Sequence, residues 1–124
     1  MSTSQKLRVA LVGLGFGAEF IPIYLNHPDV AYVGLCDSDE KVLAEHADRW
    51  SISRRYTDLE QILAGDDYDA VHIVTPIFLH AQQAIKILQS GRHCACTIPA
   101  ALTLEDLHDL VACGREEVPR PRAA

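Results

Sequence analysis

Short apolar runs alternate with longer amphipathic stretches along most of the chain. The apolar runs are expected to form five strands, at residues 7–12, 30–36, 54–56, 70–74 and 93–96. Helices are expected at 15–26, 38–50, 57–64 and 76–89, and from 103 onward. Because the strands are almost continuously apolar, helices should cover both faces of a parallel sheet. We predict a single α/β domain with a doubly wound, Rossmann-like parallel sheet in the strand order 3-2-1-4-5.

Capping residues are expected to fix where these helices begin. Asp37 or Ser38 can cap the second helix, and Thr57 with Glu60 three residues later fits a capping box. Pro76 suits the first turn of the fourth helix, since its missing N–H has no partner to lose. The first helix is expected to place Phe16, Phe20, Ile23 and Leu25 partly on one stripe. The last helix, capped by Thr103, carries an apolar face of Leu104, Leu107, Leu110 and Val111, which favours ordinary core packing.

The chain has 124 residues, of which 48% are apolar and 23% charged. This length supports one hydrophobic core and is too short for a two-domain enzyme. We predict a flexible N-terminus at residues 1–5, a folded domain at 6–113 and a disordered tail at 114–124. The tail carries two prolines and no apolar stripe, which argues against regular structure.

Charge and cysteine usage exclude several classes of protein. The net charge of −6 and the absence of a basic block argue against a nucleic-acid-binding protein. No apolar run approaches the ~20 residues of a membrane span, and the start of the chain does not fit a signal peptide. The four cysteines form no Cys-x-x-Cys pair, so we predict no metal site. Free thiols in a reducing compartment are expected, which favours a cytoplasmic protein.

A glycine-rich loop follows the first strand. Residues 13–18 read Gly-Leu-Gly-Phe-Gly-Ala, which matches G-x-G-x-x-G/A between a strand and a helix. Gly13 allows the tight turn, Gly15 lets a diphosphate approach the backbone, and Ala18 allows close packing of helix on strand. Phe16 and Gly17 belong to the same predicted loop. The helix N-terminus beyond offers free N–H groups to phosphate oxygens.

An acidic residue stands at the end of the second strand. Asp37 lies 19 residues after Ala18, close to the ~20 expected for a residue that accepts hydrogen bonds from the adenosine ribose. A carboxylate there repels a 2′-phosphate, and no arginine follows it directly. We therefore predict NAD as cofactor in preference to NADP, with Asp37 and Ser38 in the binding site. The alternative is that Asp37 only caps the helix.

The tip of the fourth strand carries Thr75-Pro76 and, further on, His80. Together with the glycine loop, Asp37 and the stretch 84–99, these residues make the chain resemble the N-terminal domain of the Gfo/Idh/MocA oxidoreductases. The resemblance covers roughly residues 6–112. It implies a Rossmann fold, a nicotinamide cofactor, and a dinucleotide site lined by Thr75, Pro76 and His80.

The chain departs from that family's pattern at two places. Ile77 stands where the family usually has asparagine, which removes one polar contact to the cofactor. Ile98 stands where the family usually has the lysine credited with proton transfer, and isoleucine has no ionisable group. We therefore assign no catalytic residue. The family's C-terminal substrate domain also exceeds this length, so we expect an incomplete catalyst.

The leading hypothesis is the NAD-binding domain of an oxidoreductase that acts on a sugar, polyol or related hydroxy compound. One alternative is a non-enzymatic NAD-binding or sensing module, and another is a Rossmann unit that binds coenzyme A or a different nucleotide. Homo-oligomers are a further expectation, because loss of a partner domain would expose apolar surface. The apolar face of the last helix is a candidate contact between copies.

Overall fold

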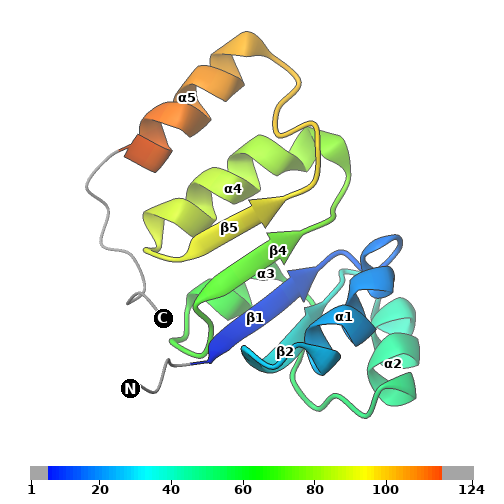
Figure 1. Ribbon diagram of the computed structural model, residues 1–124. Coiled ribbons are helices and arrows are strands. Elements are labelled where there is room, and N and C mark those ends of the chain that lie inside the picture. The colour runs from blue at the N-terminus through cyan, green and yellow to red at the C-terminus, as the bar shows by residue number, and fades with distance from the viewer. Residues whose placement is uncertain (1–5, 116–124) are drawn as a thin grey trace, which may run out of the picture.

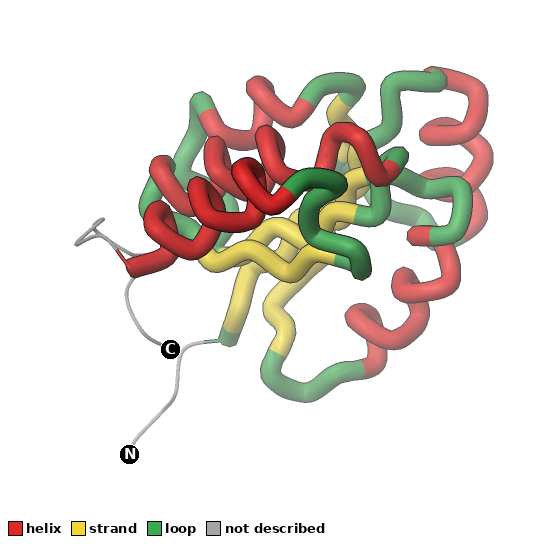
Figure 2. Tube along the Cα trace, turned by 90° about the horizontal axis from the view of Figure 1, so that it is seen from above, coloured by secondary structure: helices red, strands yellow, loops and turns green. Residues whose placement is uncertain are grey.

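The computed structural model describes residues 6–115, which form a five-stranded parallel sheet with helices on both faces (Figures 1 and 2). The strand order is β3-β2-β1-β4-β5, as predicted. The strands are β1 (Leu7–Val12), β2 (Val30–Cys36), β3 (Arg55–Tyr56), β4 (Ala70–Ile73) and β5 (His93–Cys96). The α-helices are α1 (Ile21–Asn26), α2 (Glu40–Arg49), α3 (Leu59–Leu63), α4 (His80–Gln89) and α5 (Leu104–Arg115). Short 3-10 helices precede two of them, η1 (Gly17–Phe20) and η2 (Ile77–Leu79).

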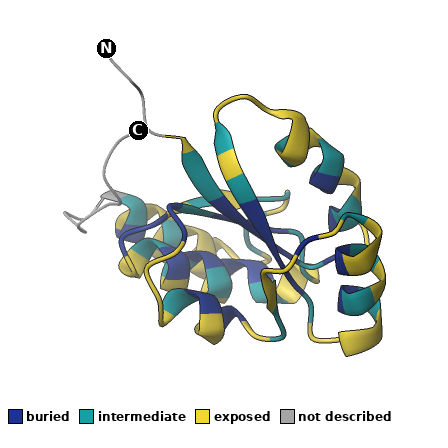
Figure 3. Ribbon diagram, turned by 90° about the horizontal axis from the view of Figure 1, so that it is seen from below, coloured by how far each residue is buried: buried dark blue, intermediate teal, exposed yellow. Residues whose placement is uncertain are grey.

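Two apolar clusters hold the helices to the sheet, one on each face. Successive side chains of a strand point to opposite faces, so Ala10 and Val12 of β1 enter one cluster and Leu11 enters the other. The first cluster is closed by α3 and α4, and the second by α1 and α2. Figure 3 shows the buried residues concentrated along the strands and the facing sides of these helices. The doubly wound arrangement therefore follows from strands that are apolar on both faces.

The first predicted helix is divided in two. A turn and η1 precede α1, and the inward residue is the fully buried Ile21. The predicted stripe is wrong in this respect, since Phe16, Ile23 and Leu25 are exposed. A 3-10 segment turns every three residues and not every 3.6, so it shifts the phase of every side chain that follows.

The caps of α2 and α3 lie one or two residues beyond the predicted positions. Asp39 caps α2 and accepts hydrogen bonds from the N–H groups of residues 41 and 42. The prediction that Asp37 or Ser38 caps this helix is therefore wrong. Asp58 caps α3 in place of Thr57, and its carboxylate accepts from the N–H of Glu60. The expected cap of α5 at Thr103 and the expected end of α4 at Gln89 are confirmed.

The helix α5 packs against α4 and not against the sheet (Figure 1). As a result, Leu104, Leu107 and Val111 are exposed, which contradicts the expectation of core packing for these three. Leu110 is half-buried and packs against the first cluster, as expected, and Cys113 is buried. The helix continues through Gly114 and Arg115, two residues into the predicted tail. The rest of that tail and the N-terminal residues 1–5 lie outside the described residues.

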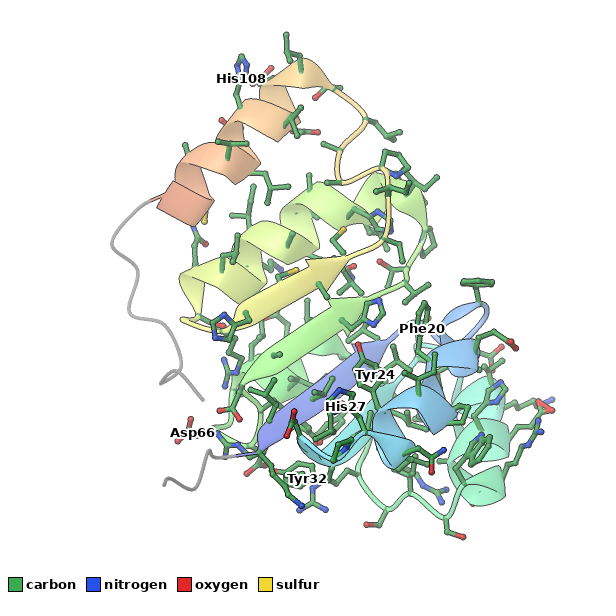
Figure 4. All side chains as sticks on the ribbon, in the orientation of Figure 1. Phe20, Tyr24, His27, Tyr32, Asp66 and His108 are labelled. Carbon is green, nitrogen blue, oxygen red and sulfur yellow. The ribbon has the colours of Figure 1, made fainter. Side chains whose placement is uncertain are left out.

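A polar contact joins α1 to the sheet. Figure 4 shows Phe20 and Tyr24 projecting from the η1–α1 segment, and both contact His72 of β4. The Tyr24 hydroxyl lies 2.7 Å from His72 Nδ1, and the Phe20 ring centroid lies 4.7 Å from the imidazole. Burial lowers the pKa of His72. His72 is therefore a buried histidine with a hydrogen-bond partner.

Three further observations concern residues 6–115 as a whole. No helix there has the length and apolar character needed to cross a membrane. No group of three histidine, cysteine or acidic side chains in this range could hold a metal ion. Its four cysteines are all free thiols.

Candidate functional site

A cleft of about 700 Å³ opens at the carboxyl ends of the central strands. Such crevices are where ligands bind in doubly wound sheets. Its walls come from the glycine loop, the tip of β2, the start of α3 and one side of α4. The lining residues are Val12, Gly13, Gly15, Cys36, Asp37, Ser38, Thr57, Asp58, Leu59, Glu60, Val74, Thr75, Pro76, Leu79, Gln82, Gln83 and Lys86.

Gly13 makes the tight turn that the sequence predicts. Its φ is 95°, and a Cβ built on it would lie 2.7 Å from the carbonyl oxygen of Val74. Its N–H donates to the carbonyl of Cys36 at 2.9 Å, so the turn is tied to the end of β2. Gly15 differs, because a Cβ there would meet no heavy atom within 4 Å. The space above Gly15 is therefore open to a ligand.

The other residues of the loop lie away from the cleft wall. Gly17 is buried, and a Cβ on it would lie 3.3 Å from the Val74 side chain. Gly17 therefore lies close to the end of the sheet, while Ala18 packs half-buried at the edge of the second cluster. Phe16 is 68% exposed at the loop tip. None of these three lines the cleft.

Asp37 lies at the wall of the cleft and is held by two backbone donors. One carboxylate oxygen accepts from the N–H of Leu14 at 2.8 Å, and the other accepts from the N–H of Asp39 at 2.9 Å. These bonds connect the tip of β2 to the glycine loop and fix the carboxylate in place. Each oxygen keeps a second lone pair, so the group can still accept hydrogen bonds from two hydroxyls. Ser38 lines the cleft beside it.

Cys36 is the floor residue next to Asp37. Burial and the neighbouring carboxylates of Asp37 and Asp58 raise the pKa of its thiol to about 12. The group is therefore a neutral, unreactive thiol at physiological pH, since the thiolate is the nucleophilic form. Cys36 contributes an apolar surface to the cleft and no covalent chemistry.

Thr75 is held by α4 from two sides. Its hydroxyl donates to Gln83 Oε1 at 2.6 Å, and its carbonyl oxygen lies 2.7 Å from His80 Nε2. His80 is only 1% exposed, and its Nδ1 lies 2.8 Å from the carbonyl oxygen of Pro99. Thr75 and Pro76 line the cleft, and His80 does not. His80 connects the loop after β4 to the loop after β5.

Several cleft residues are missed by the sequence analysis. They are Thr57, Asp58 and Glu60 at the start of α3, and Gln82, Gln83 and Lys86 on α4. Lys86 and Glu60 form an ion pair of 2.8 Å across the far end, and this hydrogen bond raises the pKa of Lys86. His80, Gln83 and Lys86 are spaced three residues apart, which places them on one face of a helix. This spacing is the sequence signal that could have identified Gln83 and Lys86.

The loop after β5 carries Thr97, Ile98 and Pro99. The Ile98 side chain is 91% exposed, and Thr97 lies beside His80, with Oγ1 3.4 Å from Nε2. Neither residue ionises in the physiological range. This loop therefore supplies no proton donor or acceptor of its own to a reacting group.

The fold and the cleft together define a dinucleotide-binding Rossmann domain. The chain belongs to the Gfo/Idh/MocA oxidoreductase family, whose NAD-binding Rossmann fold it matches over residues 7–118. It is similar to 4-carboxy-2-hydroxymuconate-6-semialdehyde dehydrogenase of Sphingobium sp., with 36% identity over 77% of this chain and 30% of that protein. It is also similar to D-apiose dehydrogenase of Paraburkholderia graminis, with 31% identity over 95% of this chain and 32% of that one.

Solved structures lead to the same assignment. The WlbA dehydrogenase from Bordetella pertussis, in complex with NADH and UDP-GlcNAcA, is similar with a TM-score of 0.82 and 30% identity. The match covers 92% of this chain and 33% of that one. The chain is an NAD-binding oxidoreductase domain, and it spans between about a fifth and a third of the length of the curated relatives it matches.

Proposed function

We propose that the cleft binds NAD with its adenosine ribose on Asp37 and its diphosphate over Gly15. The observation that carries this proposal is the fixed carboxylate of Asp37, which keeps lone pairs for both ribose hydroxyls. The open space above Gly15 supports the placement of the diphosphate. Thr75 and Pro76 line the remaining wall. Phe16, Gly17, Ala18 and His80, which the sequence also places at the site, lie beside the cleft and not in its lining.

The same carboxylate gives the preference between the two nicotinamide cofactors. A 2′-phosphate on the ribose would place its negative charge against Asp37, and the next residues are Ser38, Asp39 and Glu40. No lysine or arginine stands among residues 38–40. NAD is therefore the better ligand, and NADP binds more weakly because of charge repulsion.

Thermal unfolding with NAD, NADP, coenzyme A and S-adenosylmethionine tests this proposal. A ligand present at 100 times its Kd stabilises the folded state by about 2.7 kcal/mol. We expect NAD to raise the Tm most. The Asp37→Ala variant should lose most of that rise and its preference over NADP, whereas Asp109→Ala on α5 should behave like the wild type. A shift by coenzyme A alone would refute the proposal.

For the whole protein, we propose hydride transfer between the nicotinamide and a small hydroxy compound such as a sugar or polyol. The nicotinamide supplies the hydride chemistry when bound. This chain supplies the positions of the ribose and diphosphate. D-apiose dehydrogenase among its relatives supports that substrate class. The substrate wall and the proton-transfer group would come from outside the residues described.

A second candidate function is an NAD-binding module without turnover. It is favoured by Ile98, which occupies the position of the family's lysine and cannot transfer a proton. Absorbance of NADH at fixed NAD concentration, with polyols and sugars as substrates, separates the two. NAD binding with no NADH formed by the full-length gene product would support the module.

We further propose a cytoplasmic location and self-association. The free thiols of all four cysteines support a reducing compartment. The exposed apolar side chains Leu104, Leu107 and Val111 on α5 support a contact between copies. Sedimentation equilibrium tests the second point, because a monomer whose mass is independent of concentration would contradict it.

A further inference from the structure

We propose that Gln83 recognises the adenine base of the dinucleotide and that Thr75 orients it for this task. The inference rests on the proposed NAD site and extends it to a residue that neither the glycine-loop motif nor the family resemblance singles out. Gln83 is half-buried, lines the cleft, and lies on the α4 wall opposite Asp37.

The position of the base follows from the position of the ribose. With the ribose on Asp37 and the diphosphate towards Gly15, the base must occupy the rest of the cleft. That part is bounded by the start of α3 and by α4. Leu59 and Leu79 supply apolar surface there, and Gln83 supplies a carboxamide. A planar, apolar-faced ring with hydrogen-bonding edges fits such a wall.

Thr75 fixes which way the Gln83 carboxamide points. The Thr75 hydroxyl donates to Oε1 at 2.6 Å, so the oxygen faces the loop after β4 and keeps one lone pair. Within residues 6–115, the Nε2 amide makes no hydrogen bond, which leaves both of its N–H groups available. The side chain thus presents a donor and an acceptor together.

That pair matches adenine and not hypoxanthine. A glutamine carboxamide can accept from the N6 amino group of adenine and donate to the adjacent ring nitrogen. Hypoxanthine has a carbonyl oxygen at that carbon, which would face Gln83 Oε1 with no proton between the two oxygens. Gln83 thus supplies a polar contact from α4, whereas the isoleucine at residue 77 supplies none.

The test compares the Kd of NAD with that of nicotinamide hypoxanthine dinucleotide by calorimetry on the 124-residue chain. We expect the wild type to favour NAD by about tenfold or more. Gln83→Leu should reduce this ratio to within about twofold. Gln83→Glu should do the same, because a carboxylate retains the Thr75 bond but has no donor for the ring nitrogen. The control Gln89→Leu changes an exposed glutamine of the same helix outside the cleft and should keep the wild-type ratio.

The orienting role of Thr75 has its own readout. Thr75→Val should lower the preference for NAD, and Thr75→Ser, which restores the hydroxyl, should recover it. A wild-type ratio below about twofold, or an unchanged ratio in Gln83→Leu, would overturn the proposal while leaving NAD binding intact. No binding of NAD to the wild-type chain would instead refute the proposed function on which this inference rests.

Discussion

Two glycines of the same loop are expected to respond to alanine in opposite ways. At Gly13 the φ of 95° is a conformation that alanine adopts only with strain of about 1–2 kcal/mol. The added Cβ would also lie 2.7 Å from the oxygen and 2.8 Å from the carbon of the Val74 carbonyl. Those are backbone atoms of the segment after β4, so they cannot rotate away. We expect Gly13→Ala to lower the free energy of unfolding by about 3 kcal/mol in total.

Gly15→Ala removes no protein contact and adds none, because no heavy atom lies within 4 Å of the new Cβ. Its effect on the free energy of unfolding should stay within about 0.5 kcal/mol. The methyl group would instead enter the space assigned to the diphosphate. Overpacking of that kind costs about 1–3 kcal/mol, which corresponds to a loss of roughly fivefold to 150-fold in NAD affinity.

Urea unfolding of the chain without ligand and calorimetric titration with NAD measure the two effects separately. Gly13→Ala should show a clearly lower urea midpoint with an unchanged m-value, and a Tm about 10 °C or more lower. Gly15→Ala should unfold like the wild type and bind NAD poorly. The reasoning is refuted if Gly15→Ala binds NAD as tightly as the wild type, or if both variants lose stability equally.

Three further predictions concern stability alone. Asp69 is buried, accepts from the Arg8 backbone N–H at 3.0 Å and pairs with the Arg8 guanidinium at 2.8 Å. Asp69→Asn should therefore lower the free energy of unfolding by about 2 kcal/mol, measured by urea unfolding. Asp39→Ala, which removes the cap of α2, should cost about 1 kcal/mol in the same assay. Burial lowers the pKa of His72, so the unfolded chain binds more protons below about pH 6.5 and stability should fall as the pH drops through that range. His72→Gln should weaken this dependence, measured as the difference in urea midpoint between pH 7.5 and 5.5.

The sheet could be predicted because its signal is local and repeated. Runs such as residues 7–12 and 30–36 are apolar at nearly every position, which indicates strands covered on both faces. Helical stretches between the strands require right-handed crossovers, and these leave few possible strand orders. The strand order β3-β2-β1-β4-β5 could therefore be predicted largely from the alternation of strands and helices, without knowledge of any single contact.

The errors arise where a distant part of the chain decides a local feature. Residues 37–39 read Asp-Ser-Asp, and any of the three suits a helix cap. Asp37 is used by the N–H groups of Leu14 and Asp39, so the cap moves to Asp39. The residues around position 37 do not indicate that Leu14 lies beside Asp37. In the same way, the apolar residues of α5 fit a buried helix, but α5 packs on α4 and leaves Leu104, Leu107 and Val111 exposed.

The α4 wall of the cleft shows which residues of the site a sequence motif identifies and which only the contacts reveal. The sequence marks Thr75, Pro76 and His80, all near the tip of β4, but it does not distinguish a residue that faces the cleft from one that holds it. His80 is nearly inaccessible and spends both ring nitrogens on carbonyl contacts at Thr75 and Pro99. Its neighbour one turn on, Gln83, faces the cleft and shares Thr75 with it. Because residues three apart on a helix lie on one face, the histidine that fixes the loop brings the glutamine to the wall of the cleft. A residue identified by its motif can therefore be the support, while a residue that faces the cleft carries no motif.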